Sequence, residues 1–501
     1  MVSSLATVSD SSTASSTHAR KLVATRPATR IVLDNHYSSK VYGSSSPVSG
    51  KVVVEPEYDM SFDTIQVLLM GVSKTETDST AGPISRQHLF LKLQMPIPED
   101  DMPVPRIFER GNRYKFPFNF VVPSYLTINA CSHHVNSDHV RDSHLLVPPT
   151  MGSWEKDDMT PNMARVEYDI RVRILREPIQ PGGKPIKLCE ASQSINVLPA
   201  SYEEAPLSIC KDDKAYRMAR TKSIRKGMFG SKIGDVTMTA SQPGPIVLGP
   251  DGRRACETKA HVKFCFNPTA ADSLPPKITA VSTKLVAHTY YSNDGFDKFP
   301  NIGEWNLEFG QHRRGEYYTS VHLPGGDKST PKLKWKQQLA AHARRDSGYG
   351  TESERDQSPR NSITDMRRKS SGSSPIFHTS HLNVPITLPT NKKTFIPTFH
   401  SCITSRTYVL RVSVTLTSGS SNTNLSLALP LQIAVESPDA HHAGSLGLPS
   451  WEEAIQQEEA MAADEMFVPR AMRAPEVQFY QSRGELPGYD ELARTRPLAA
   501  F

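Results

Sequence analysis

The chain has 501 residues, enough for two or three domains with separate hydrophobic cores. Only 37% of the residues are apolar and 39 are prolines, so we expect folded domains diluted by disordered segments. The net charge of +6 is the sum of 58 basic and 52 acidic residues, and this balance gives no indication of a nucleic-acid partner. The absence of a run of eighteen apolar residues argues against a membrane span.

Residues 1–28 form a polar tail that we expect to be disordered. Strand patterns begin at residue 31 and recur along the chain, separated by turn-forming clusters of glycine, serine and proline. The predicted strands of this first series cover residues 31–33, 51–54, 64–70 and 88–95. Their short spacing and the lack of a helical period predict a β-sandwich.

Residues 114–122 carry the largest aromatic face of this series. Tyr114, Phe116, Phe118 and Phe120 alternate with polar residues and proline, which predicts a half-buried strand. Pro117 cannot donate a ladder hydrogen bond, so we expect a sheet edge or a bulge there. Residues 164–175 alternate in the same way, with apolar residues on one face and charged residues on the other.

The sequence divides into two sandwiches and their flanking segments. We predict a first sandwich over residues 29–200, and over 201–250 a junction that includes the start of the second sandwich. The second sandwich continues over 251–438, interrupted by a disordered insertion at about 325–375 that has lost hydrophobic periodicity. Residues 439–501 form an acidic and mixed tail with one short helix.

Several motifs resemble those of arrestin-like proteins. Residues 114–122, 146–149 and 166–174 are similar to the arrestin N-terminal domain, and residues 394–399 with 401–412 are similar to the end of the C-terminal domain. The resemblance covers about 30–438 and is closest to fungal α-arrestin-type proteins. It implies an all-β fold with two β-sandwiches in tandem, joined by a hinge. It also implies an adaptor that links membrane cargo to other machinery without catalysis.

Three short sequences echo one another, starting at Leu198, Leu448 and Leu486. The last, Leu486-Pro487-Gly-Tyr489, has the form Leu-Pro-x-Tyr and differs from the Pro-Pro-x-Tyr ligand of WW domains only at its first position. Such a ligand places its proline in an aromatic groove and its tyrosine in a neighbouring pocket. In α-arrestins these motifs recruit HECT-type ubiquitin ligases, so the resemblance implies a WW-domain partner.

The other two copies depart further from that motif. Leu448-Pro449-Ser-Trp451 has tryptophan in place of tyrosine, and the copy at 198 carries one extra residue before Tyr202. The alternative for both is a helix start, because the serine of Ser-Trp-Glu-Glu or Ser-Tyr-Glu-Glu fits a capping box. We expect the copy at 198 to lie at the domain junction.

The insertion offers candidate phosphorylation sites. Basic residues precede Ser347 and Ser370 by two or three positions, and residues 346–351 resemble a phosphodegron. The basic runs at 211–226 and 366–369 could favour an anionic membrane surface. For both features the alternative is an ordinary solvated segment.

The sequence shows no catalytic or metal-binding pattern. The six cysteines include no Cys-x-x-Cys pair, so we predict neither a zinc site nor a disulfide framework, but free thiols in a reducing compartment. Cys265 is expected to be a buried small hydrophobe. The histidine pairs at 133–134 and 441–442 have no acid or cysteine partners at ligand spacing, which favours chance or solvent-facing pairs. We therefore expect no enzyme and no cofactor.

We predict a cytoplasmic adaptor that is recruited to the plasma membrane and endosomes. Its partners are the cytoplasmic segments of membrane transporters or receptors and a WW-domain HECT-type ubiquitin ligase, with peripheral membrane contact and no nucleic acid. The function is ubiquitination and endocytosis of that cargo. One alternative is an arrestin-fold scaffold or retromer-like coat subunit that recruits no ligase. A more remote one is an immunoglobulin-like DNA-binding regulator, which needs salt-sensitive binding through a basic loop cluster.

Overall fold

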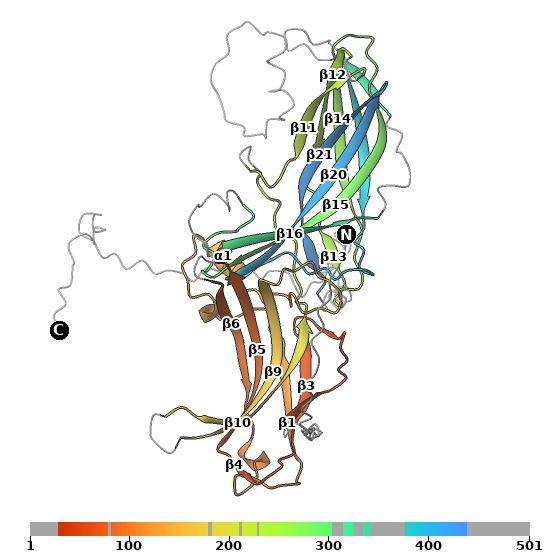
Figure 1. The fold of residues 1–501 in the computed structure, drawn as a ribbon. Coiled ribbons are helices and arrows are strands. Elements are labelled where there is room, and N and C mark those ends of the chain that lie inside the picture. The colour runs from red at the N-terminus through yellow and green to blue at the C-terminus, as the bar shows by residue number, and fades with distance from the viewer. Residues whose placement is uncertain are drawn as a thin grey trace, which may run out of the picture. The chain divides into compact units, whose positions relative to one another are not determined.

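The computed structural model describes residues 29–78, 82–178, 183–209, 213–227, 230–302, 314–324, 334–339 and 376–437. Its strands gather in two sets (Figure 1), the first coloured red to yellow and the second mostly green to blue. We call the set within residues 29–197 the first sandwich and the set within residues 219–435 the second sandwich. The predicted tails at 1–28 and 439–501 lie outside the described residues.

The first sandwich contains two main sheets that share one apolar core. One sheet has the order β1-β3-β8, with β1 (Thr29–Leu33), β3 (Pro47–Val54) and β8 (Tyr114–Val121). The other has the order β2-β10-β9-β5-β6, with β2 (Val41–Tyr42), β10 (Ile186–Val197), β9 (Ala164–Arg176), β5 (Thr64–Thr77) and β6 (Ile84–Met95). A short ribbon pairs β4 (Met60–Ser61) with β7 (Ile107–Phe108), and the 3₁₀ helix η1 (Glu99–Asp101) precedes β7.

The aromatic strand predicted at 114–122 is confirmed as β8. Phe116, Phe118 and Phe120 are buried, and the residues between them are exposed. β8 is the last strand of its sheet, which agrees with the edge position expected from Pro117. The three buried rings contribute much of the inner face of this sheet, so they account for a large part of its stability.

Strand β9 forms the centre of the opposite sheet, between β10 and β5. Its apolar side chains from Val166 to Ile174 are completely or almost completely buried, as the alternation predicts. The charged residues of the other face pair across the sheet. Lys74 Nζ lies 2.6 Å from Glu167 Oε2, and Arg173 Nε lies 2.9 Å from Glu190 Oε1. These pairs are partly exposed, so their contribution to stability is small.

The second sandwich also contains two main sheets around one core. One has the order β11-β12-β14-β18-β17, with β11 (Ala219–Arg225), β12 (Lys232–Ala240), β14 (Thr258–Pro268), β18 (Ile376–Ile386) and β17 (Lys336–Leu339). The other contains β16 (Arg314–His322), β15 (Lys277–Ser292), β20 (Thr404–Ser418) and β19 (Phe399–His400), and β21 (Ser421–Leu431) pairs with β20. A separate two-stranded parallel sheet of β13 (Ile246–Leu248) and β22 (Ile433–Val435) completes the second sandwich.

A buried tyrosine on a long strand anchors a proline-containing segment in each sandwich. Tyr168 in β9 donates its hydroxyl proton to the carbonyl oxygen of Pro148. Tyr408 in β20 donates to the carbonyl oxygen of Ile396, at 2.8 Å. Both segments belong to the motifs that carry the arrestin resemblance. Each bond satisfies a phenol that burial would otherwise leave without a partner.

The expectation of a disordered insertion over all of about 325–375 is wrong for residues 336–339. Residues 336–339 form β17, which pairs with β18. Trp335, just before the strand, packs near Phe264 and Phe266, and its Nε1 donates to the carbonyl oxygen of Pro276 at 3.1 Å. One tryptophan therefore fixes a polar stretch whose own pattern gives no strand signal. The rest of the insertion lies outside the described residues.

The expectation that Cys265 is a buried small hydrophobe is also wrong. Phe264 and Phe266 are fully buried, and Cys265 lies between them on β14 with its side chain on the opposite, partly exposed face. Because side chains alternate along a strand, a cysteine between two core phenylalanines must face away from the core.

The sequence pattern missed one helix, α1 (Asp138–His144). Ser137 is its N-cap, and Ser137 Oγ accepts a hydrogen bond from the backbone N–H of Val140. The helix has only seven residues and three of them are buried, Val140, Ser143 and His144. A helix this short leaves too little hydrophobic periodicity to be recognised from sequence. Within the described part of the chain, no helix is long and apolar enough to cross a membrane.

A fully buried arginine joins the two sandwiches. Arg406 in β20 is 0% exposed, and its guanidinium reaches the first-sandwich segment that precedes β9. Nη1 donates to the carbonyl oxygen of Asp158 at 2.9 Å, and Nη2 donates to Thr160 Oγ1 at 2.7 Å. A buried charge without such partners would be strongly destabilising, so these bonds fix the two segments against each other.

A second polar contact lies where β15 ends. Thr75 Oγ1 in β5 donates to the carbonyl oxygen of Ser292 at 3.0 Å. Asn293 donates its amide protons to Thr77 Oγ1 at 2.6 Å and to the carbonyl oxygen of Ile84 at 2.9 Å. Thr75, Thr77 and Asn293 are all buried, so water does not compete freely for these bonds. The seam between the sandwiches is therefore held by specific polar pairs.

We expect Phe116→Ala to lower the free energy of unfolding by about 3–5 kcal/mol, because it removes a fully buried ring from the first core. Chemical denaturation followed by tryptophan fluorescence measures this change. The matched control is Lys115→Ala on the exposed face of the same strand, for which the change should stay within about 0.5 kcal/mol. Equal effects of the two substitutions would contradict the assigned strand orientation.

We expect Arg406→Ala to lower the free energy of unfolding by about 3 kcal/mol, because it leaves buried acceptors on Asp158 and Thr160 without donors. Amide hydrogen exchange should also accelerate over residues 157–160 of the first sandwich. Arg411→Ala, on an exposed position of the same strand, is the control and should leave both quantities unchanged. If amide exchange accelerated only within the second sandwich, Arg406 would not stabilise the contact between the two sandwiches.

Candidate functional site: a cysteine and histidine cluster at the seam

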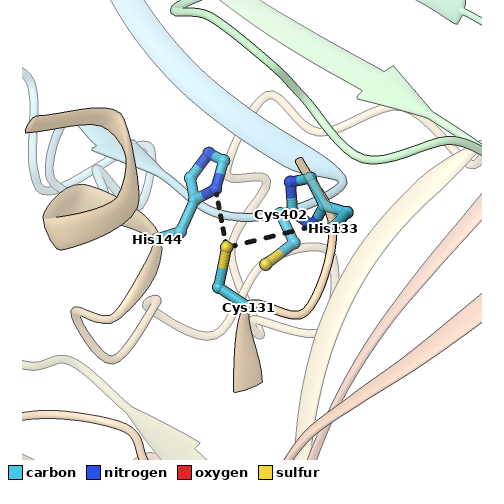
Figure 2. Close-up of side chains that lie close together, drawn as sticks. All are labelled: Cys131, His133, His144 and Cys402. Atoms are coloured by element: carbon cyan, nitrogen blue, oxygen red, sulfur yellow. Dashed lines mark hydrogen bonds between the residues drawn. The ribbon is translucent and has the colours of Figure 1, made fainter. Parts of the chain in front are cut away.

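Two thiols and two imidazoles converge at the seam. Their ligand atoms all lie within 4.8 Å of one another, and Figure 2 shows the four side chains directed toward a common centre. The four residues are Cys131, His133, His144 and Cys402. Three come from the first sandwich and the fourth from the second, so the cluster crosses the same seam as Arg406.

Cys131 and His133 follow a turn of 3₁₀ helix, η2 (Ile128–Ala130). Cys131 is the C-cap residue of that turn, and its backbone N–H bonds to the carbonyl oxygen of Ile128. The thiol is 2% exposed and points into the cluster. Cys131 Sγ lies 3.9 Å from His133 Nδ1 and 3.6 Å from His144 Nδ1.

His144 is the last residue of α1, and it is 1% exposed. The capping bond of Ser137 fixes where the helix begins, and seven residues later the chain delivers His144 to the cluster. Leu145, the C-cap, donates its backbone N–H to carbonyl oxygens of the last turn. The position of the imidazole is therefore set by both helix ends.

Cys402 lies in the tight connection between β19 and β20. Ser401 closes this turn, because its backbone N–H donates to the carbonyl oxygen of Thr404 at 2.9 Å and its hydroxyl makes a further bond to the same oxygen. Cys402 Sγ lies 3.5 Å from the carbonyl oxygen of Ala130, across the seam. Cys131, Cys402 and Ile403 form a small apolar cluster, against which Val135 and Leu145 pack.

The segment after β15 holds the ring of His133. His133 Nε2 lies 3.0 Å from the carbonyl oxygen of Phe296. A carbonyl only accepts hydrogen bonds, so Nε2 carries the proton and Nδ1 presents its lone pair to Cys131. Gly295 allows this approach, since a Cβ added there would lie 2.2 Å from His133 Cδ2. Asn136 and Asp297 add a backbone hydrogen bond of 2.8 Å between the same two segments.

Burial determines the protonation of two members of the cluster, His144 and Cys402. Burial lowers the pKa of His144 to about 3, with smaller contributions from nearby His133 and His88, so its imidazole is neutral at pH 7. Burial also raises the pKa of the Cys402 thiol well above its usual range, and the neighbouring Cys131 raises it further. In the absence of a bound cation, Cys402 is therefore a protonated thiol.

The expectation of a chance or solvent-facing pair at 133–134, without a cysteine partner, is wrong for His133. His133 is half-buried beside Cys131, whereas His134 is exposed. The local signal was the Cys-x-His spacing of residues 131–133. No local pattern could have found Cys402, which only the fold brings to this place. Two thiols and two imidazoles are a donor set that zinc and other soft divalent metals accept.

The residues proposed from sequence for partner binding and modification lie outside the described residues. This applies to the motif copies at 448 and 486 and to the two candidate phosphorylation sites, that is, to Leu448, Pro449, Trp451, Leu486, Pro487, Tyr489, Ser347 and Ser370.

The third motif copy, at 198, is described and has a structural role. Leu198 is 1% exposed and belongs to the second core, whereas Tyr202 is 78% exposed. The helix-cap alternative is wrong here, because no helix forms over residues 201–204. Ser201 Oγ instead accepts a hydrogen bond from the backbone N–H of Val435 at 3.1 Å. Ser201 also forms an isolated antiparallel bridge with Val435 of β22.

The basic run at 211–226 contributes to a hollow of about 380 Å³ beside β11 and β21. Among the described residues, every charged one that lines the hollow is cationic: Lys214, Arg217, Arg220, Lys222 and Arg411. The first four are local in sequence, and Arg411 joins them from β20. Such a surface attracts phosphate or carboxylate groups.

Comparison with known proteins bears on the second sandwich. Residues 327–435 match the family described as the Bul1 C terminus, whose members are arrestin-related adaptors. The matched range contains β17 to β22. It therefore includes β17, the edge strand that the sequence pattern does not predict. No curated protein matches the chain. The match and the all-β architecture confirm the resemblance drawn from the motifs: the fold is consistent with that of arrestin-like proteins, and residues 327–435 of the second sandwich are similar to the Bul1 C terminus.

Proposed function

We propose that this protein is a trafficking adaptor that links plasma-membrane cargo to a WW-domain HECT-type ubiquitin ligase. The observation that carries the proposal is the match of residues 327–435 to the Bul1 C terminus within an arrestin-like fold. The cargo is the cytoplasmic segment of a transporter or receptor, and its ubiquitination leads to endocytosis. The adaptor acts in the cytoplasm, is recruited to the plasma membrane and endosomes, and performs no catalysis.

The ligase contact is assigned to Leu486, Pro487 and Tyr489, with Leu448, Pro449 and Trp451 as a weaker second ligand. The Leu-Pro-x-Tyr sequence retains the proline and the tyrosine that fill the two pockets of a WW domain. The two copies are 38 residues apart between Leu448 and Leu486, so both could bind one ligase with several WW domains and raise the effective affinity.

The copy at 198 does not suit WW binding, because it is part of the second sandwich. This supports assigning the ligase contact to the copies at 486 and 448. The leucine of the copy at 198 belongs to the second core, and its serine is bonded to β22. Binding in a WW groove would require the segment to leave the sandwich, at the cost of that buried area. Tyr202 is nevertheless exposed, so it offers a matched control.

The basic hollow is proposed as a contact with the anionic inner leaflet of the membrane. Each cation near such a surface contributes about 1 kcal/mol, so several together give a useful affinity. Because the hollow belongs to the second sandwich, this contact is independent of the tail motif. Phosphorylation of Ser347 or Ser370, close in sequence to this sandwich, would add negative charge and weaken the contact.

We expect a WW-domain array from a HECT-type ligase to bind the full chain with micromolar affinity and to lose at least about tenfold in affinity on Tyr489→Ala. Fluorescence anisotropy titration measures this difference. Tyr202→Ala is the control, because it removes an exposed tyrosine from the copy whose leucine is buried, and its affinity should equal that of the wild type. Unchanged binding by the Tyr489 variant would favour the arrestin-fold scaffold without ligase recruitment.

We expect the double variant Arg217→Ala/Arg220→Ala to bind vesicles of phosphatidylcholine and phosphatidylserine about 30-fold more weakly than the wild type, at about 1 kcal/mol per cation. Vesicle co-sedimentation at two salt concentrations measures the loss and its electrostatic origin. Lys259→Ala/Lys277→Ala removes two exposed lysines that do not line the hollow, and serves as the control. An equal loss in both variants would show that only net charge matters.

A further inference from the structure

We propose that Cys131, His133, His144 and Cys402 form a zinc site that ties the first sandwich to the second. The inference rests on the geometry of the cluster alone and stands or falls independently of ligase recruitment. It adds a metal ion to a protein whose sequence gives no zinc pattern.

The separations of the donor atoms fit tetrahedral zinc. With Zn–S bonds of about 2.3 Å and Zn–N bonds of about 2.0–2.1 Å, ligand atoms around a tetrahedron lie about 3.4–3.8 Å apart. Cys131 Sγ lies 3.6 Å from His144 Nδ1 and 3.9 Å from His133 Nδ1, and all four donors are within 4.8 Å of one another. Side-chain adjustments of less than about 1 Å would complete the coordination shell.

A backbone carbonyl already orients one of the four ligands. The bond of His133 Nε2 to the carbonyl oxygen of Phe296 leaves Nδ1 free to ligate, as backbone carbonyls do for metal-bound histidines elsewhere. Gly295 lies against the Cγ, Cδ2 and Nε2 atoms of the ring, so the ring leaves no room for a Cβ at residue 295. The ring thus has a fixed tautomer and a fixed position before any metal binds.

Without a metal, the polar groups of the cluster make only weak hydrogen bonds. Thiols are weak donors and weak acceptors; Cys131 Sγ lies 3.6 Å and 3.9 Å from the two imidazoles, and Cys402 Sγ lies 3.5 Å from the carbonyl oxygen of Ala130. Zn²⁺ with two thiolates and two neutral imidazoles has no net charge, so this centre can be buried at little electrostatic cost. Cys131, His144 and Cys402 are each at most 3% exposed, which suits a closed structural site rather than an open catalytic one.

The surroundings of the cluster also favour a metal link between the two sandwiches. The apolar group formed by Cys131, Cys402 and Ile403 is far smaller than the two main cores, and it is packed against the seam. Cys402 comes from the turn after β19, so coordination would fix that turn of the second sandwich against η2 and α1 of the first.

The first test uses the unmodified full chain and needs no variant. Purified under reducing conditions without chelator, it should contain one zinc ion per chain by plasma mass spectrometry. After zinc removal, added Co²⁺ should give the near-ultraviolet thiolate charge-transfer band and the intense visible bands of a tetrahedral centre. Absence of both stoichiometric zinc and the cobalt spectrum would overturn the proposal. So would a Cys131–Cys402 disulfide whose reduction restores no metal uptake.

Variants then locate the site. Cys402→Ser and His133→Ala should each lose stoichiometric zinc and the cobalt spectrum, and the wild type, but neither variant, should have its Tm lowered by a chelator. Cys256→Ser and His134→Ala remove an exposed thiol and an exposed imidazole and are the matched controls. Zinc loss of equal size in the controls would point to adventitious metal at surface groups.

One further variant keeps all four ligands. Gly295→Ala should displace the ring of His133 and weaken zinc binding about 10- to 100-fold in a competition titration with a chromogenic chelator. Gly244→Ala, at a second-sandwich glycine where an added Cβ meets only Thr258 Oγ1 at 3.6 Å, is its control. Unchanged affinity in Gly295→Ala would exclude His133 as a ligand. Because this test retains every donor, it remains informative where ligand variants fail to fold.

Discussion

A fully buried guanidinium is the interaction on which the arrangement of the two sandwiches depends. Arg406 belongs to the core strand β20, yet its acceptors lie in the segment before β9. Separating the sandwiches would leave that charge unsolvated or require β20 to expose it, and both are costly. Asn293 imposes the same condition at the end of β15, where it bonds to Thr77 and Ile84. These bonds are directional, so they select one relative placement of the packed segments.

The interactions that span the seam join buried groups of the same chain. They involve neither the charged outer face of β9 nor the basic hollow. In the copy at 198, the leucine belongs to the second core and the serine is bonded to β22, so this copy is part of the fold.

Period-two patterning was enough to predict the two sandwiches. Each strand buries one face, so apolar and polar residues alternate along its own sequence. The aromatic face of β8 and the alternation of β9 are examples. The failures arose where a partner distant in sequence decided the outcome. β17 forms because Trp335 packs on Phe264 and Phe266, and Ser201 bonds to Val435 instead of capping a helix. Neither partner can be recognised from the local sequence.

The cysteine and histidine cluster is the extreme case of that limitation. Its first two donors are two residues apart, but its last donor follows His144 by 258 residues, in another sandwich. Sequence patterns for zinc rely on ligand pairs that are close in the chain, whereas a site between domains needs only that the fold bring its donors together. A metal at such a place would add fixed distances between β19, η2 and α1 where apolar contact is sparse. It would therefore complement Arg406. The buried guanidinium fixes β20 against the segment before β9, and a coordinated ion would fix the turn after β19 against η2 and α1.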